Sequence, residues 1–212
     1  MLFNGFGEHN IQGIGDKHIP LIHNVMNTDV ATAVSDTATD QLLILFNTDV
    51  GRDYLIDRRR VPSDLVAKLA GLGISSICNV LAAIKTAKHF GLGSQDVLVT
   101  VATDGAAMYG SEVQRLSAIH YPDGFDAVSA GEDFGRNLLG ATTDHLLELT
   151  LADRERIFNL GYFTWVEQQG VELAEFTARR DQQFWKDLRE IVPVWDGMIE
   201  ELNARTGVLE SL

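Results

Sequence analysis

The sequence predicts an α/β fold, with a parallel-sheet portion over residues 1–120 and a helical extension over residues 121–212. Three observations lead to this prediction. The run Val97–Val101 is almost continuously β-branched, which is typical of a strand buried on both faces of a parallel sheet. The stretch Asp29–Ser35 alternates in hydrophobicity and indicates a second strand. Beyond residue 120 apolar residues recur mainly at helical spacing.

The helices follow from apolar periodicity and from residues that start and stop helices. The clearest one follows Gly73, places Ile77, Leu81 and Ile84 on one face, and ends at Gly91. Thr150 with Asp153 three residues later resembles a capping box and predicts another helix start. Further helices are expected over about 36–46, 63–70, 111–120, 132–139, 150–169, 171–191 and 194–205.

Composition limits the possible functions. The formal net charge of −13 argues against a protein that binds nucleic-acid phosphates, because such a protein needs a basic face. No apolar run has the length of a membrane span, and the first residues do not have the pattern of a secretory signal. Cys78 is the single cysteine, so no internal disulfide is possible. We therefore expect a cytoplasmic protein that binds neither nucleic acid nor membrane.

Two polar turns form the candidate site. Thr103, Asp104 and Gly105 directly follow the expected strand Val97–Ala102, and ligands of open α/β sheets lie outside the carboxyl ends of strands. Gly73–Ser76 precedes the clearest helix, whose first backbone N–H groups are free to bind an anion. Both turns belong to one helix–strand unit, so we expect them to be close together.

Two motifs resemble a known family. The segment Gly73-Ile74-Ser75-Ser76 is followed by a helix, an apolar run and a small polar turn before Tyr109. Upstream, His9–Pro20 contains the letters IQGIG and then IP. In this order the two segments resemble the C-terminal part of cysteine synthase (O-acetylserine sulfhydrylase), which belongs to the pyridoxal-phosphate enzymes of the tryptophan synthase β type. The resemblance extends over about residues 10–112.

This resemblance implies that the chain takes part in binding pyridoxal 5'-phosphate. A hydroxyl at the second turn of the family bonds the pyridine nitrogen, and the alignment leaves open whether Thr103 or Asp104 takes that place. A carboxylate from Asp104 would favour a protonated ring nitrogen. Gly13, Gly15 and Gly73 are glycines at which the backbone would approach the ligand. The simpler interpretation is that these residues, together with Ser75, form turns and helix caps.

The resemblance also implies that parts of the family's active site come from elsewhere. The family's Schiff-base lysine, substrate-binding asparagine loop and phosphate loop precede the IQGIG segment. Lys17 is in the wrong part of the family order to serve as that lysine. We therefore expect this chain to be a C-terminal portion of a split lyase or transferase. Its partner would be a lysine-bearing N-terminal-half subunit with which it shares the cofactor.

Such a hetero-oligomer would catalyse β-elimination or β-replacement on an amino-acid substrate, and this chain alone would be inactive. Two alternatives remain open: a non-catalytic regulatory or interaction subunit that retains part of the fold, and an inert fragment. The aromatic residues of the helical extension, such as Trp165, Trp185 and Trp195, favour a partner interface there. Asp16 and His18 are candidates for contacts with substrate, Cys78 is expected to pack, and no histidine spacing predicts a metal site.

Overall fold

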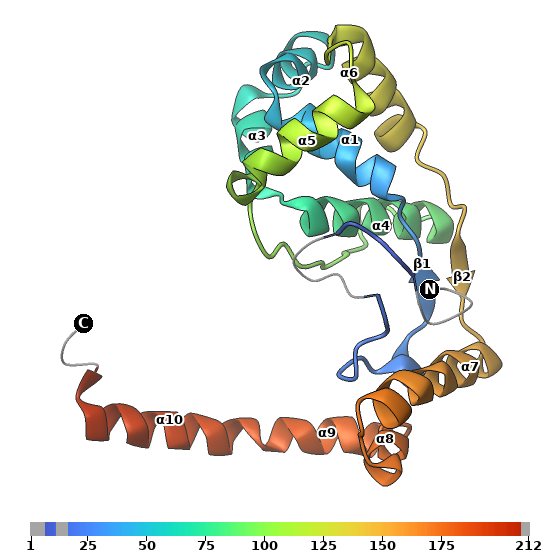
Figure 1. Cartoon of the computed structure of the whole chain (residues 1–212), viewed down its shortest axis with the longest axis vertical. Helices are drawn as coiled ribbons and strands as arrows, with labels where there is room; N and C mark the ends of the chain where they lie inside the picture. The colour runs from blue at the N-terminus through green and yellow to red at the C-terminus, as the bar shows by residue number, and fades with distance from the viewer. Residues whose placement is uncertain (1–6, 12–16, 209–212) are drawn as a thin grey trace. The chain divides into compact units, whose positions relative to one another are not determined.

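The computed structural model describes residues 7–11 and 17–208, and it is built mainly of helices (Figure 1). Within the described residues the chain divides into two compact units. The first comprises residues 7–11, 17 and 30–148, and the second comprises residues 18–29 and 149–208. Each unit has its own buried side chains, so the two are considered separately.

The predicted parallel-sheet α/β fold is wrong. The sheet found among the described residues has two short strands, β1 (Val30–Thr32) and β2 (Leu146–Glu148), which pair antiparallel with Ala31 opposite Leu147. The first strand lies inside the expected segment Asp29–Ser35. Its partner comes from a segment more than one hundred residues later. Local pattern cannot specify such a long-range pairing.

The expected strand Val97–Ala102 has no regular secondary structure and no sheet partner among the described residues. Among the residues that the structure describes, no backbone–backbone hydrogen bond reaches residues 97–102. The amide of Asn79 donates to the carbonyl oxygen of Val101 at 2.9 Å. Val97 and Val99 are 84% and 91% exposed. The prediction of a strand buried on both faces is wrong for this segment, because a strand requires a neighbouring strand with which to share its hydrogen bonds.

Helix α1 (Asp36–Asn47) forms the centre of the first unit. Five consecutive residues, Leu42–Phe46, are buried, so the helix is covered around its whole circumference. It contacts α2 (Asp49–Asp53), α4 (Ile74–Phe90), α5 (Gly110–His120) and α6 (Ala127–Phe134), which surround it in Figure 1.

Two of the other helices of this unit, α2 and α6, continue into π-helical turns. Helix α3 (Ser63–Lys68) begins after Pro62, and α4 ends at Gly91, which has φ of 62°. The π-helical turns Tyr54–Arg58 and Gly135–Leu139 extend α2 and α6. Helices α3, α4 and α5 agree with the ranges expected from periodicity. Helix α6 begins five residues before the expected range 132–139, and the second part of that range forms a π-helical turn.

The second unit contains α7 (Leu151–Tyr162), α8 (Leu173–Ala178), α9 (Gln182–Glu190) and α10 (Val192–Thr206). Thr150 and Asp153 form the predicted capping box at the start of α7. Phe158 and Phe176 are buried against each other with ring centroids 4.7 Å apart. A π-helical turn, Phe163–Gln168, follows α7.

Within the described residues, no one helix is both long and apolar enough for a membrane crossing; the segments Ser63–Gly71 and Ile74–Phe90 meet the criterion only as a pair, with a bend of 116° between them.

Replacing Leu43 by alanine should lower the free energy of unfolding by about 2–5 kcal/mol, because Leu43 is fully buried and its loss leaves a cavity inside the packing around α1. Leu65→Ala is the matched control, since Leu65 in α3 is 49% exposed. Urea denaturation of the two variants measures the difference. Equal destabilisation by both would contradict the central position of α1.

Candidate functional site at the start of helix α4

The structure brings together four of the six residues predicted to form the site. The backbone N–H of Gly73 donates to the carbonyl oxygen of Asp104 at 2.9 Å. The hydroxyl oxygens of Ser75 and Thr103 lie 3.1 Å apart. The first turn of α4 and the turn after residue 102 are therefore in direct contact, as the sequence predicts. Gly13 and Gly15 lie outside the described residues.

The carboxylate of Asp104 is the centre of this cluster. Its Oδ1 accepts a hydrogen bond from the Thr103 hydroxyl at 3.2 Å, and its Oδ2 accepts one from the Tyr109 hydroxyl at 2.5 Å. A carboxylate has about four lone-pair positions, so these two bonds leave room for another donor. Thr103 is exposed and Asp104 is half-buried, which makes the cluster accessible from solvent.

Tyr109 connects the Asp104 carboxylate to the buried interior of the first unit. The Tyr109 side chain belongs to the buried cluster around α1. Burial, followed by the hydrogen bond and the charge of Asp104, raises the pKa of the Tyr109 phenol to about 12. The phenol is therefore neutral and a hydrogen-bond donor throughout the physiological range. Sequence reasoning used Tyr109 only as a landmark of the motif, because a tyrosine by itself does not show which group it contacts.

Gly73 is required by close packing. A Cβ atom at this position would lie 2.4 Å from Oδ1 of Asp104 and 2.8 Å from a ring carbon of Tyr109. Gly73 is also the N-cap residue of α4, and no side chain caps the helix. Ser75 does not cap the helix: its hydroxyl contacts Thr103. The first N–H groups of α4 lack intrahelical acceptors and give this end partial positive charge.

Cys78 and Lys17 have ordinary structural surroundings. Burial, with a smaller contribution from the Asp36 carboxylate, raises the pKa of the Cys78 thiol, so this thiol is not activated. Lys17 forms an exposed ion pair with Glu8 at 2.7 Å. Asp16, a candidate for contact with substrate, lies outside the described residues. Among the residues that the structure describes, no group of three or more His, Cys, Asp or Glu side chains could hold a metal ion.

A second polar cluster was not found from the sequence. Asp40, in the buried helix α1, accepts hydrogen bonds from the Asn10 amide at 3.0 and 3.1 Å and lies 3.3 Å from Nε2 of His120. Asp40 is only 4% exposed, so these contacts offset the cost of burying its charge. The arrangement has the character of a structural network. Sequence reasoning missed it because Asp40 is 30 positions from Asn10 and 80 positions from His120.

Comparisons with known proteins give no further assignment: no family profile, no curated protein and no solved structure matches this chain.

Gly73→Ala should displace the Asp104 carboxylate and lower the free energy of unfolding by roughly 1–3 kcal/mol, the usual cost of overpacking. Gly71→Ala is the control, because a Cβ atom there meets nothing within 4 Å. Thermal and urea denaturation measure both variants. The contact between the two turns would be refuted if Gly73→Ala were as stable as Gly71→Ala.

The Tyr109–Asp104 bond should make stability depend on alkaline pH. In the unfolded chain the phenol ionises at its ordinary pKa of 10, whereas in the folded chain it ionises at about 12. The stabilisation is therefore complete below pH 10 and is lost as the pH rises from 10 to about 12. Tyr109→Phe lacks this dependence, so the difference in unfolding free energy between wild type and variant should shrink over that range. A difference that stays constant to pH 12 would contradict the raised pKa.

Proposed function

We propose that this chain provides the ring-binding side of a pyridoxal-phosphate site and that a partner chain provides the lysine. The observation that carries the proposal is the direct contact between Ser75 and Thr103, which are 28 positions apart in the sequence. The resemblance to the cysteine synthase family implied a site made from these same two turns. The contact between the two turns supports a common role in binding the cofactor.

The chemistry of the cluster fits such a cofactor. Asp104 has a carboxylate with unused acceptor positions, and it is oriented by the buried Tyr109. A protonated pyridine nitrogen would donate to this carboxylate, and the neighbouring Thr103 hydroxyl would contact the same edge. When bound, the cofactor supplies an electron sink for a carbanion at the α-carbon of an amino acid. Asp104 strengthens that property by keeping the ring nitrogen protonated.

The lysines of this chain are engaged elsewhere or lie outside the cluster. Lys85 donates to the carbonyl oxygen of Ala33 at 2.7 Å, and Lys88 donates to that of Ala141 at 2.6 Å. The contacts described for Gly73, Ser75, Thr103 and Asp104 do not include a lysine. A Schiff-base lysine from an N-terminal-half subunit is therefore part of the proposal, with β-elimination or β-replacement on an amino acid as the reaction.

The segment Val97–Val101 is the proposed contact with that subunit. It exposes β-branched side chains, and no backbone–backbone hydrogen bond reaches it from the described part of the chain. Thr103 follows shortly after it. Adding this segment to an edge strand of the partner would satisfy its backbone hydrogen bonds and would place the partner beside Asp104. The same exposure favours a second candidate function, a non-catalytic interaction subunit. The two functions differ in whether the complex contains the cofactor.

Asp104→Asn should weaken cofactor retention by about 0.5–3 kcal/mol in the complex and should change its absorption spectrum, because an amide cannot keep the ring nitrogen protonated. Asp96→Asn is the matched control, since the Asp96 carboxylate accepts only a local bond from the N–H of Gly93 at 2.8 Å. The complex is obtained by affinity purification of the full chain from its native host, and absorbance and cofactor content are then measured.

The chain alone serves as a second control. Incubation with pyridoxal phosphate and borohydride should leave no stable adduct at Lys17. A colourless complex would support the interaction subunit. If the complex is yellow but Asp104→Asn and Asp96→Asn have the same absorbance and cofactor content, Asp104 does not contact the cofactor.

A further inference from the structure

Arg179, which directly follows helix α8, is a buried cation. The residue is only 7% exposed, and its Nε and Nη1 atoms are buried without a hydrogen-bond partner among the described residues. Burial lowers the pKa of the guanidinium, yet an arginine remains protonated at physiological pH. A buried charge whose donors find no acceptor is costly. This position therefore requires an acceptor that the described side chains do not supply.

The ionisable side chains near Arg179 do not neutralise its charge. Arg180, the next residue, takes Glu155 as its ion-pair partner. The carboxylate of Asp181 caps the start of helix α9. Burial and, to a smaller extent, the charge of Arg179 lower the pKa of the His23 imidazole. His23 is therefore a neutral neighbour at physiological pH and supplies no negative charge.

Two aromatic rings lie against the guanidinium of Arg179. Its Cζ atom is 4.7 Å from the centroid of the Phe176 ring and 5.3 Å from the centroid of the Phe158 ring. Both side chains are buried and pack against each other. Cation–π contact stabilises the charge, but a ring face is a weak hydrogen-bond acceptor. The rings therefore position the guanidinium without replacing the hydrogen bonds that its N–H groups lack.

The geometry of the guanidinium indicates where an acceptor can bind. A guanidinium has two edges that each present two parallel N–H groups, one formed by Nη1 with Nη2 and the other by Nε with Nη2. In Arg179, Nη2 has no hydrogen-bond partner among the described residues and is not fully buried. Because Nη2 belongs to both edges, a planar carboxylate that reaches it also accepts a bond from Nη1 or Nε. One ligand group can therefore satisfy a buried donor together with the accessible one.

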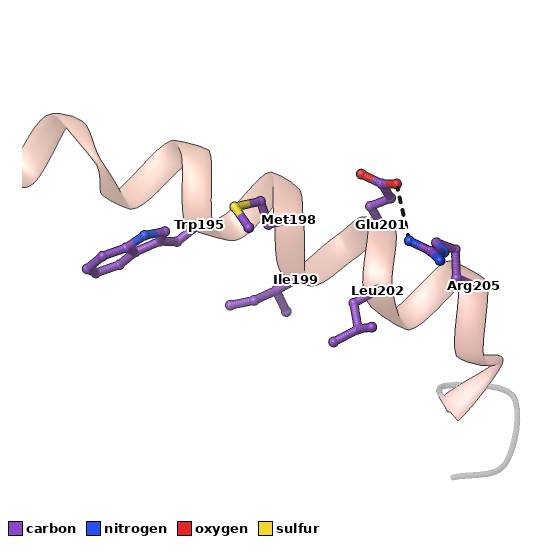
Figure 2. Close-up of a pocket in the computed structure, with 6 residues that line it drawn as sticks. All are labelled: Trp195, Met198, Ile199, Glu201, Leu202 and Arg205. Carbon is purple, nitrogen blue, oxygen red and sulfur yellow. Dashed lines mark ion pairs between the residues drawn. The ribbon is translucent and has the colours of Figure 1, made fainter.

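The shallow hollow along α10 makes no comparable demand for a ligand. Its lining residues, drawn in Figure 2, all come from this one helix and are exposed. Its two charged residues, Glu201 and Arg205, form an exposed i,i+4 ion pair at 3.9 Å. A ligand site requires walls on several sides, which one helix does not provide. Arg179, in contrast, lies against two buried rings and has unpaired donors.

We propose that Arg179 binds the carboxylate of a small organic acid while its guanidinium lies against Phe158 and Phe176. The slight exposure of Arg179 admits only a small group. The net charge of −13 repels a carboxylate monoanion less than a phosphate dianion. The site lies wholly in the second unit. It does not depend on the pyridoxal-phosphate proposal, because none of its residues belongs to the Asp104 cluster.

Titration of the full chain with sodium acetate, compared with sodium chloride at equal ionic strength, tests the site. Acetate that binds the folded chain should raise the melting temperature in a saturable manner. Arg179→Met should weaken acetate binding at least roughly 10-fold, the effect of losing charge-assisted hydrogen bonds. Arg180→Met is the matched control, because Arg180 also lies over the Phe158 ring, at 4.4 Å, but already has an acidic partner. This control should keep the wild-type response.

Heteronuclear NMR follows the contact directly in the wild-type chain, so this measurement does not depend on the folding of a variant. The guanidinium signals of Arg179 should shift as acetate is added, and inorganic phosphate at equal ionic strength should shift them less. Signals that acetate leaves unchanged would overturn the proposal, as would equal responses of wild type and Arg179→Met.

Two further outcomes would refute the ligand class. A larger response to phosphate than to acetate would exclude a carboxylate as the preferred group. If the Arg179 signals shift only when a different polypeptide is added, the acceptor belongs to that polypeptide and not to a small acid.

Discussion

The first unit depends on the complete burial of helix α1. A helix that is covered on all sides contributes a large apolar surface, but it must also find partners for every polar side chain that it buries. Thr39, Asp40 and Gln41 are three consecutive buried polar residues of α1. Gln41 accepts a hydrogen bond from the Asn137 amide at 2.9 Å, and Thr39 donates to a carbonyl of its own first turn at 2.7 Å. Together with the contacts of Asp40, these bonds fix which distant segments surround the helix.

The same constraint positions the candidate site. Tyr109 is part of the buried cluster around α1, while its hydroxyl reaches the carboxylate of Asp104 at the surface. Tyr109 therefore links the candidate site to the buried cluster around α1. Gly73 permits this close approach, because any side chain there would occupy the position of the carboxylate. The close contacts among Gly73, Asp104 and Tyr109 therefore follow from the way the buried side chains beneath them pack.

Two apolar surfaces of the described chain remain outside the cores, and they differ in what their backbones require. The segment Val97–Val101 exposes side chains and has no backbone–backbone hydrogen bond to other described residues, so its natural complement is another strand edge. Helices α9 and α10 satisfy their backbone hydrogen bonds internally and expose only side chains. Their surface therefore carries no such backbone requirement.

The sequence by itself determined the local features of this protein. Most helix positions, the capping box at Thr150 and the contact between the turns at Gly73 and Asp104 could be predicted, because they depend on residues close together or on one helix and its return segment. The early start of α6 and the break between α8 and α9 were not predicted. Only the tertiary structure decided the fold class, since strand pairing joins Ala31 to Leu147 and leaves Val97–Val101 outside the sheet that the described residues form. Tertiary structure also decided that Tyr109 supports Asp104 and that Asp40 meets Asn10 and His120. The physical reason is that local periodicity specifies the conformation of a segment, whereas its partner is selected by packing over the whole unit.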